Sequence, residues 1–235
     1  MASVGIIIND KSDRSQSVLD ELLYVSKRFS NIYTEVLDGV RQLGRVLSDM
    51  NRKKVDTLIL AGGDGTLQAV FTDAINNRRF DNAPGYVALP CGMTNVIAAD
   101  CGLQGDPARS LDRFLIRRQK GEVRPLRRSL LSVSTDGSAP VYGFFLGAGA
   151  FCSAVDFSRA RVQSKGVKRT VALVASVAGY VAKVAANPAG TIDPIELDVV
   201  DPSSDDKRRD ASRLRSIYLA TTLSKLGGGI YPFWG

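Results

Sequence analysis

The sequence of 235 residues contains no histidine. This excludes Ser-His-Asp and Cys-His catalytic groups, histidine-ligated metals and the histidine-containing catalytic loop of protein kinases. Cysteine is almost as scarce, with only Cys91, Cys101 and Cys152 and no zinc-type spacing. Such an odd and scattered set indicates a reducing compartment, and it predicts neither a disulfide framework nor a structural zinc.

Long apolar runs are also missing. The most apolar window, 170–182, is shorter than the roughly 20 residues that a membrane-spanning helix needs. It is rich in alanine and flanked by basic residues, so a buried helix is expected there. The first residues lack a basic region followed by an apolar stretch, and so do not resemble a signal peptide. These features predict a cytoplasmic protein.

Acidic residues are outnumbered, with 24 Asp and Glu against 31 Lys and Arg and a formal net charge of +7. A basic surplus favours polyanions such as an anionic membrane surface or phosphorylated small molecules. Basic and aromatic residues are not interleaved, so nucleic acid is not an expected partner. One basic cluster is either a solvated surface or a lipid-docking surface; its members are Arg117, Arg118, Lys120, Arg124, Arg127 and Arg128.

The first half of the chain alternates between strand-like and helix-like patterns. Apolar runs predict strands at 4–8, 32–37, 55–61 and 85–89, and apolar residues at helical spacing predict helices at 18–29, 40–50 and 67–75. A short helix is predicted from about residue 95 to 102, and Asp106-Pro107 predicts the start of another. This order favours a parallel sheet covered by helices on both faces, which is a three-layer α/β domain.

The second half indicates antiparallel β structure with one or two helices. A hairpin is predicted from 130–135 and 141–146 around the turn Asp136-Gly137-Ser138. Strands are predicted at 195–199 and 213–223, separated by a polar loop at 201–212. The predicted domains are therefore an α/β nucleotide-binding domain at 1–125 and a β-rich, sandwich-like domain at 126–235.

The run Gly62-Gly63-Asp64-Gly65-Thr66 lies directly between a predicted buried strand and a predicted helix. Glycines free the backbone N–H groups to approach an anion, and the helix N-terminus adds a favourable dipole. Asp64 is an unusual neighbour for phosphate unless it handles Mg²⁺ or a proton. The alternative is an ordinary tight turn. The sequence has no G-x-x-x-x-G-K-[ST] motif, which excludes a P-loop.

Two segments together resemble the diacylglycerol and sphingosine kinase catalytic family. Residues 60–67 match its GGDGT signature, which NAD kinases share, and 89–98 (LPCGMTNVIA) are similar to its P-x-G-T-x-N-D-x-A motif. Residues 8–12 partly match the family's N-P-x-S-G loop. The segments 144–149 and 226–232 are more weakly similar to segments of the family's β-rich second domain.

The resemblance implies an ATP-dependent kinase that phosphorylates a lipid hydroxyl, with Mg²⁺ bridging phosphate oxygens. Asp64 is the implied base or Mg²⁺ residue, and replacing it with Asn is expected to abolish transfer without unfolding the protein. The implied location is the cytoplasm, with peripheral association to an anionic membrane. The sequence leaves both a monomer and a homodimer open. The implied nucleotide-binding residues are Asn9, Gly62, Gly63, Asp64, Gly65, Thr66, Gly92, Thr94 and Asn95.

Several positions depart from the family pattern. Met93 stands at the usual Thr, Val96 at the usual Asp, Ala69 at a frequent Glu and Asp10 at the usual Pro. The acidic D-G-x-[LE] motif that follows the Gly-rich segment in the family is not reached before Gly235, so a C-terminally truncated chain is expected. A kinase of a soluble substrate such as NAD, and an inactive nucleotide- or lipid-binding homologue, are the alternatives.

Overall fold

A computed structural model describes most of the first 152 residues and shorter stretches after them. The described residues are 3–12, 14–100, 103–152, 179, 195–196, 214–215, 217–226 and 231. By its internal contacts the chain forms two compact units, one of Met1–Phe144 with Thr222–Gly235 and one of Phe145–Thr221.

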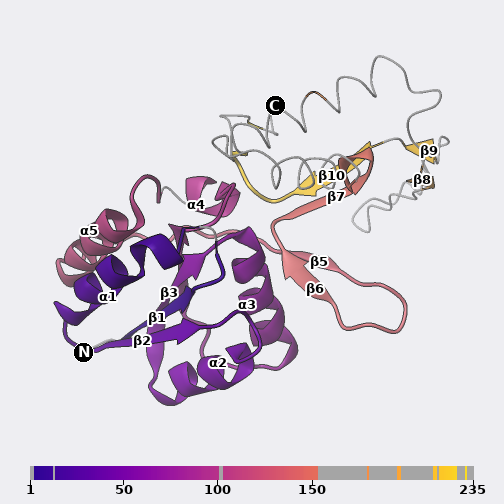
Figure 1. The fold of residues 1–235 in the computed structure, drawn as a ribbon. Coiled ribbons are helices and arrows are strands. Elements are labelled where there is room, and N and C mark those ends of the chain that lie inside the picture. Colours follow the sequence, from indigo (N-terminus) through magenta and orange to yellow (C-terminus); the bar gives the residue numbers. More distant parts are fainter. Residues whose placement is uncertain are drawn as a thin grey trace. The chain divides into compact units, whose positions relative to one another are not determined.

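The first unit is built on a four-stranded parallel sheet with the order β2-β1-β3-β4 (Figure 1). Its central strands are nearly continuous apolar runs that are buried on both faces, as parallel strands usually are. Side chains alternate between the faces, so Ile7 enters one apolar cluster while Ile6 and Ile8 enter the other. The strands are β1 (Ser3–Asn9), β2 (Ile32–Leu37), β3 (Val55–Gly62) and β4 (Gly85–Pro90).

Helices cover both faces of this sheet. One apolar cluster contains residues of α2, α3 and α4, and the other contains residues of α1 and α5. The predicted three-layer α/β arrangement is therefore confirmed. The helices are the 3-10 turn η1 (Gln16–Val18), α1 (Leu19–Lys27), α2 (Leu43–Arg52), α3 (Asp64–Asn76), α4 (Val96–Asp100) and α5 (Pro107–Gln119).

The hairpin that follows α5 is shorter than the sequence predicts. Strands β5 (Leu131–Val133) and β6 (Val141–Gly143) pair antiparallel around the predicted turn. Strand β6 is held on α3, because Tyr142 N donates to Thr72 Oγ1 at 3.0 Å and Asn76 Nδ2 donates to Pro140 O at 2.8 Å. The pairing ends at Gly143.

In the second unit, β7 (Phe145–Gly149) pairs antiparallel with β10 (Ile217–Thr221). The short strands β8 (Ile195–Glu196) and β9 (Leu214–Arg215) form another antiparallel pair. The expected antiparallel β content is thus confirmed. The predicted polar loop at 201–212 and most of the predicted helix at 170–182 lie outside the described residues.

The contact division falls at residue 144, later than the predicted domain boundary at 125, which stays a prediction. The hairpin is grouped with the first unit because β6 packs on α3. Among the residues that the structure describes, no helix is long and apolar enough to cross a membrane.

The sheet order creates a switch point between β1 and β3. The chain leaves β1 toward α1 on one face and leaves β3 toward α3 on the other. In open parallel sheets, ligands bind beside the carboxyl ends of the strands at such a point. Asn9 ends β1 and Gly62 ends β3, so the motif residues lie where the topology favours a ligand.

Candidate functional site

The loops that follow β1, β3 and β4 meet at the carboxyl edge of the sheet. The nine predicted binding residues all lie in or directly beside these loops, and hydrogen bonds or close backbone contacts connect the three loops to one another. The structure thus brings the predicted residues together, although most of their side chains bond to one another.

The loop after β1 is attached to the start of α3. The buried Asn9 side chain donates from Nδ2 to Thr66 Oγ1 at 2.8 Å, and its Oδ1 accepts from Lys11 N at 3.2 Å. Ser12 Oγ accepts from Gly63 N at 3.3 Å and lies 3.4 Å from Thr66 Oγ1. The Thr66 hydroxyl is therefore fixed between two loops, which makes Asn9 and Thr66 part of the frame of the site.

Helix α3 begins with an open N-terminus. Gly63 is its N-cap and offers no side chain, and no side-chain cap is found at this helix end. The Gly63 carbonyl accepts from Thr66 N and Leu67 N, and the first-turn N–H groups of Asp64 and Gly65 have no acceptor within the helix. A Cβ atom at Gly65 would have nothing within 4 Å. The N-terminus of this 13-residue helix is thus accessible to an anion.

Gly63 and Gly92 bring the first and second motifs into backbone contact. A Cβ atom at Gly63 would lie 3.1 Å from Gly92 Cα, and one at Gly92 would be driven far inside the van der Waals radius of Gly63 Cα. Gly62, at the end of β3, is equally confined, because a Cβ there would meet Cβ of Thr66 at 2.7 Å. The glycines of both motifs therefore permit close packing between loops.

Asn95 closes the loop that follows β4. Its Oδ1 accepts from Gly92 N and its Nδ2 donates to Gly92 O, each at 2.6 Å. The backbone of Asn95 is left-handed with φ of 50°, a conformation that Asn tolerates better than most residues. An asparagine is therefore suited to this position both by its side chain and by its backbone.

Asp64 joins the first motif to the second. Its Oδ2 accepts from Thr94 Oγ1 at 2.7 Å and from Val96 N at 3.2 Å, and its Oδ1 accepts from Ile97 N at 3.1 Å. Three of its roughly four lone-pair sites are thus occupied. The half-buried Asp64 carboxylate acts as an external cap for α4, which the sequence did not predict.

The shift of threonine by one position in the second motif has a structural explanation. The Thr94 hydroxyl reaches Asp64 from the position after Met93, so the hydroxyl that fixes Asp64 is present. Cys91, in the same loop, is fully buried, and burial raises the pKa of its thiol to about 11. At neutral pH this thiol is protonated, which disfavours a role as a nucleophile.

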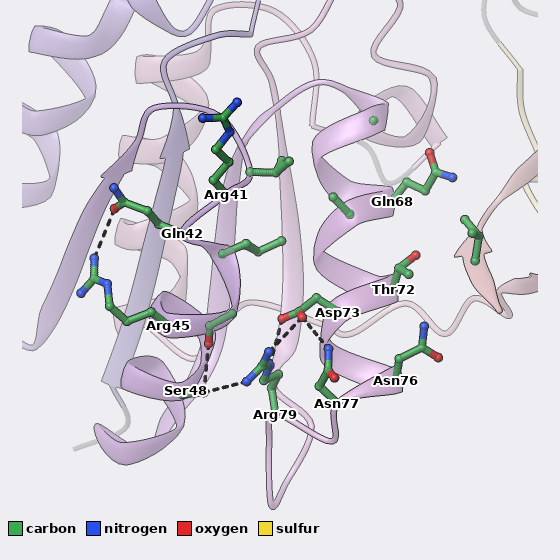
Figure 2. Close-up of a pocket in the computed structure, with 16 residues that line it drawn as sticks. Arg41, Gln42, Arg45, Ser48, Gln68, Thr72, Asp73, Asn76, Asn77 and Arg79 are labelled. Atoms are coloured by element: carbon green, nitrogen blue, oxygen red, sulfur yellow. Dashed lines mark hydrogen bonds and ion pairs between the residues drawn. The ribbon is translucent and has the colours of Figure 1, made fainter. Parts of the chain in front are cut away.

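A cavity of about 740 Å³ extends from Gly65 between α2 and α3. Figure 2 shows Arg41 and Gln68 on its two walls toward the N-terminal end of α3, and Asp73 and Arg79 toward the C-terminal end. Arg79 Nε donates to Asp73 Oδ2 at 2.9 Å, whereas Arg41 forms no ion pair with the described residues. The cavity thus offers a cation without an ion-pair partner among the described residues, at the end where Gly65 lies.

Ser12 and Arg41 also lie at the candidate site, and the sequence did not predict either of them there. Ser12 belongs to the loop that was compared with N-P-x-S-G, so the serine of that motif was an available signal. Arg41 carries no local signal, because its position beside the cavity depends on how α2 packs against α3.

The basic cluster near the end of α5 is partly engaged in ion pairs. Arg117 lies 3.8 Å from Glu122, Arg118 lies 2.6 Å from Asp56 and Arg128 lies 2.7 Å from Asp100. Among the described residues, the remaining members have no ion-pair partner; they are Lys120, Arg124 and Arg127.

The model of the diacylglycerol kinase catalytic domain matches residues 3–126, which hold all three loops of the site. The chain belongs to this family. The family is one of kinases, and the resemblance of the sequence motifs is thereby confirmed. A search of curated proteins finds no match.

Solved structures from Bacillus anthracis strain Sterne have the same fold. The crystal structure of a candidate diacylglycerol kinase is 14% identical with a TM-score of 0.63, over 96% of this chain and 68% of that one. Another structure of a candidate diacylglycerol kinase from this strain is 14% identical with a TM-score of 0.61, over 97% of this chain and 68% of that one. At these identities the likeness establishes the fold alone.

Proposed function

We propose that the protein transfers the γ-phosphoryl group of ATP to the hydroxyl of a lipid, yielding a phosphorylated lipid and ADP. The observation that carries this proposal is the open N-terminus of α3 at Gly65, placed at the switch point of the sheet and braced by two other motif loops. An uncapped helix N-terminus with free backbone N–H groups favours a phosphate ligand.

The residues present fit a nucleotide. The N–H groups of Asp64 and Gly65 would bind phosphate oxygens, and the cavity beside Gly65 has room for the rest of the molecule. Arg41, the cation of the cavity without an ion-pair partner among the described residues, would add positive charge close to the phosphates. Mg²⁺, when bound with the nucleotide, supplies charge neutralisation between phosphate groups, and the last free lone-pair site of Asp64 suits such an ion.

Asp64 serves mainly to position the loops in this proposal. Its carboxylate holds Thr94 and the start of α4, which fixes the second motif beside the phosphates. Phosphoryl transfer depends largely on positioning and on charge neutralisation, so a rigid connection between the two motifs serves the reaction directly. The bonds that already occupy Asp64 favour this role over that of a free general base.

A matched pair of variants at Gly65 tests the proposal. Gly65→Asp places a carboxylate in the open space beside the phosphates, where charge repulsion should weaken ATP binding at least about tenfold. The fold should survive, because the space is open and acidic residues stabilise a helix N-terminus. Gly65→Ala is the control, and it should retain most of the affinity. Titration calorimetry with Mg·ATP and thermal melting measure both effects.

A kinase assay on the wild type then separates the candidate functions. Labelled ATP is supplied with Mg²⁺ and with micelles of diacylglycerol or sphingosine, or with NAD as a soluble acceptor. The proposal expects label in a lipid product, and it expects Gly65→Asp to lose this activity. Label in NADP would instead indicate a kinase of a soluble substrate, and ATP binding without any transfer would indicate an inactive homologue.

Access to a lipid in a membrane would use the segment after α5. Lys120, Arg124 and Arg127 have no ion-pair partner among the described residues, and the side chains between them include Val123, 38% exposed, and Leu126, 56% exposed. Exposed apolar side chains among unpaired cations are suited to the surface of an anionic bilayer. Peripheral association with such a surface is therefore part of the proposal.

Vesicle flotation tests this part. Binding to phosphatidylcholine vesicles that contain phosphatidylglycerol should exceed binding to pure phosphatidylcholine, and salt should weaken it. Replacing Arg124 and Arg127 by Gln should reduce binding about tenfold or more, since each cation near the surface contributes about 1 kcal/mol. The same charge change at Arg52 and Lys53, at the end of α2, is the control. Equal binding to both kinds of vesicle would contradict peripheral docking by charge.

A further inference from the structure

Helix α4 is held by a carboxylate at each end. It has only five residues, too few for a helix to be stable by itself. At its N-terminal end, Val96 N and Ile97 N donate to Asp64. At its C-terminal end lies Asp100, whose side chain is 1% exposed although it carries a charge. A carboxylate buried to this degree must be paired.

Asp100 is paired with two segments that are remote in sequence. Its Oδ2 accepts from Arg128 Nε at 2.7 Å, and its Oδ1 accepts from Lys225 N at 2.9 Å. Arg128 precedes the β5-β6 hairpin, and Lys225 lies in the segment that follows β10. One buried carboxylate therefore fastens α4 both to the chain before the second unit and to the chain after it.

Apolar packing reinforces this connection. Leu223 is buried in the same cluster as Ile97 and Ala98 of α4, and Leu226 packs against that cluster. The segment that follows β10 and helix α4 thus share both an apolar cluster and a part-buried hydrogen bond. A displacement of the segment at 222–226 would therefore disturb the packing of α4, and a displacement of α4 would disturb that segment.

We propose that Asp100 is a positioning residue for the nucleotide-binding loops. By fixing the C-terminal end of α4 to Arg128 and Lys225, it sets the N-terminal end of the helix, and with it Thr94, against Asp64. The link to ATP rests on the proposed function, whereas the coupling between the two ends of α4 is a property of the free protein. Because coupling is reciprocal, ATP binding at the loops also protects the hydrogen bond at Lys225.

Amide hydrogen exchange in the free, full-length protein tests the coupling with Asp100→Asn. Arg128 and Lys225 donate to different oxygens of Asp100, and Asn replaces one of these oxygens with an NH₂ group, so one of the two donors loses its acceptor. Exchange should become about tenfold faster at Lys225 and also at Val96 and Ile97, the amides at the far end of α4. The matched control is Asp112→Asn on α5, which removes a more exposed ion pair with Arg28 and should leave these amides unchanged.

Faster exchange at Lys225 with unchanged exchange at Val96 and Ile97 would overturn the proposal, because the two ends of α4 would then be independent. Arg128→Lys is the milder variant if Asp100→Asn does not fold. It keeps a cation for the Asp100 carboxylate but loses the guanidinium geometry, and it should give the same pattern with a smaller acceleration.

A second comparison adds Mg·ATP. In the wild type it should slow exchange at Lys225, and Asp100→Asn should bind ATP several-fold more weakly. ATP that binds the wild type but leaves exchange at Lys225 unchanged would also overturn the coupling. A wild type that does not bind ATP would contradict the proposed function, and the comparison in the free protein would still decide the role of Asp100.

Discussion

Gly92→Ala is expected to abolish nucleotide binding and to destabilise the protein markedly. The new Cβ would be driven into the Gly63 backbone, which has no flexible side chain that could move away. The loops after β3 and β4 would have to separate, and forced overpacking of this kind costs typically 1–3 kcal/mol and occasionally more. We expect the free energy of unfolding to fall by about 3 kcal/mol and ATP affinity to fall by at least roughly 100-fold.

Gly85→Ala is the matched control, since Gly85 begins β4, the strand that leads into the loop with Gly92. A Cβ there would meet only the carbonyl oxygen of Asp56 at 3.7 Å, which is an ordinary contact. Chemical denaturation and ATP titration of both variants measure the two effects. If the free energy of unfolding of Gly92→Ala lies within about 1 kcal/mol of the wild-type value and the variant still binds ATP, the contact between Gly63 and Gly92 does not stabilise the site.

The arrangement of the first unit follows from local sequence patterns. Buried parallel strands are recognisable as continuous apolar runs, and the helices by apolar residues at helical spacing. The predicted helix start at Asp106-Pro107 is also confirmed. The Asp106 side chain caps α5 by accepting from Arg109 N, and proline occupies the next position. The meeting of the motif loops also follows, since parallel strands bring their carboxyl ends to one edge.

The partners of individual polar side chains did not follow from the sequence. Asp100 and Lys225 are separated by 125 positions, and neither lies in a recognisable motif. The hairpin ended early for a similar reason, since residues beyond Gly143 pair with β10. Contacts of this kind depend on how elements pack, and local periodicity carries no information about it.

The glycine-rich loop at 62–66 shows what a sequence motif can predict and what it cannot. Its glycines were predicted to let the backbone approach an anion, whereas in the fold the nearest neighbour of Gly63 is the glycine of another loop. The accessible position is Gly65 alone, where a Cβ would meet nothing within 4 Å. A motif therefore locates a site, whereas only the fold shows which of its residues face a ligand and which hold the loops together.

Asp64→Asn is expected to impair both stability and phosphoryl transfer. From the sequence alone, this substitution should spare the fold, but the structure gives the carboxylate three donors to satisfy. The Asn oxygen can replace Oδ1 or Oδ2 but not both. In either orientation the amide nitrogen faces at least one backbone N–H, at Val96 or Ile97. A buried donor left without an acceptor costs about 1–3 kcal/mol; because these bonds are part-buried, the free energy of unfolding should fall by about 1 kcal/mol, the lower end of this range.

Asp106→Asn is the matched control for stability. Asp106 also accepts a backbone N–H at the start of a helix, but it receives only one such bond, from Arg109 N. Asn is as good an N-cap as Asp, so the free energy of unfolding of this variant should lie within about 0.5 kcal/mol of the wild-type value. A melting curve for Asp64→Asn that matches the control would show that the bonds at Asp64 contribute little to the fold.

Kinetics of a double-mutant cycle then distinguish positioning from direct chemistry at Asp64. Thr94→Val removes only the hydroxyl that Asp64 accepts, while the carboxylate itself remains. If Asp64 acts by holding the second motif, both single variants should lose transfer activity and the double variant should lose little more, because the two groups act as one unit. If Asp64 also accepts a proton from the substrate hydroxyl, the activity loss of Asp64→Asn should exceed that of Thr94→Val by on the order of 10²–10⁴-fold. We expect the first outcome, because the donors at Thr94, Val96 and Ile97 already occupy most of the carboxylate, and strictly additive losses would contradict it.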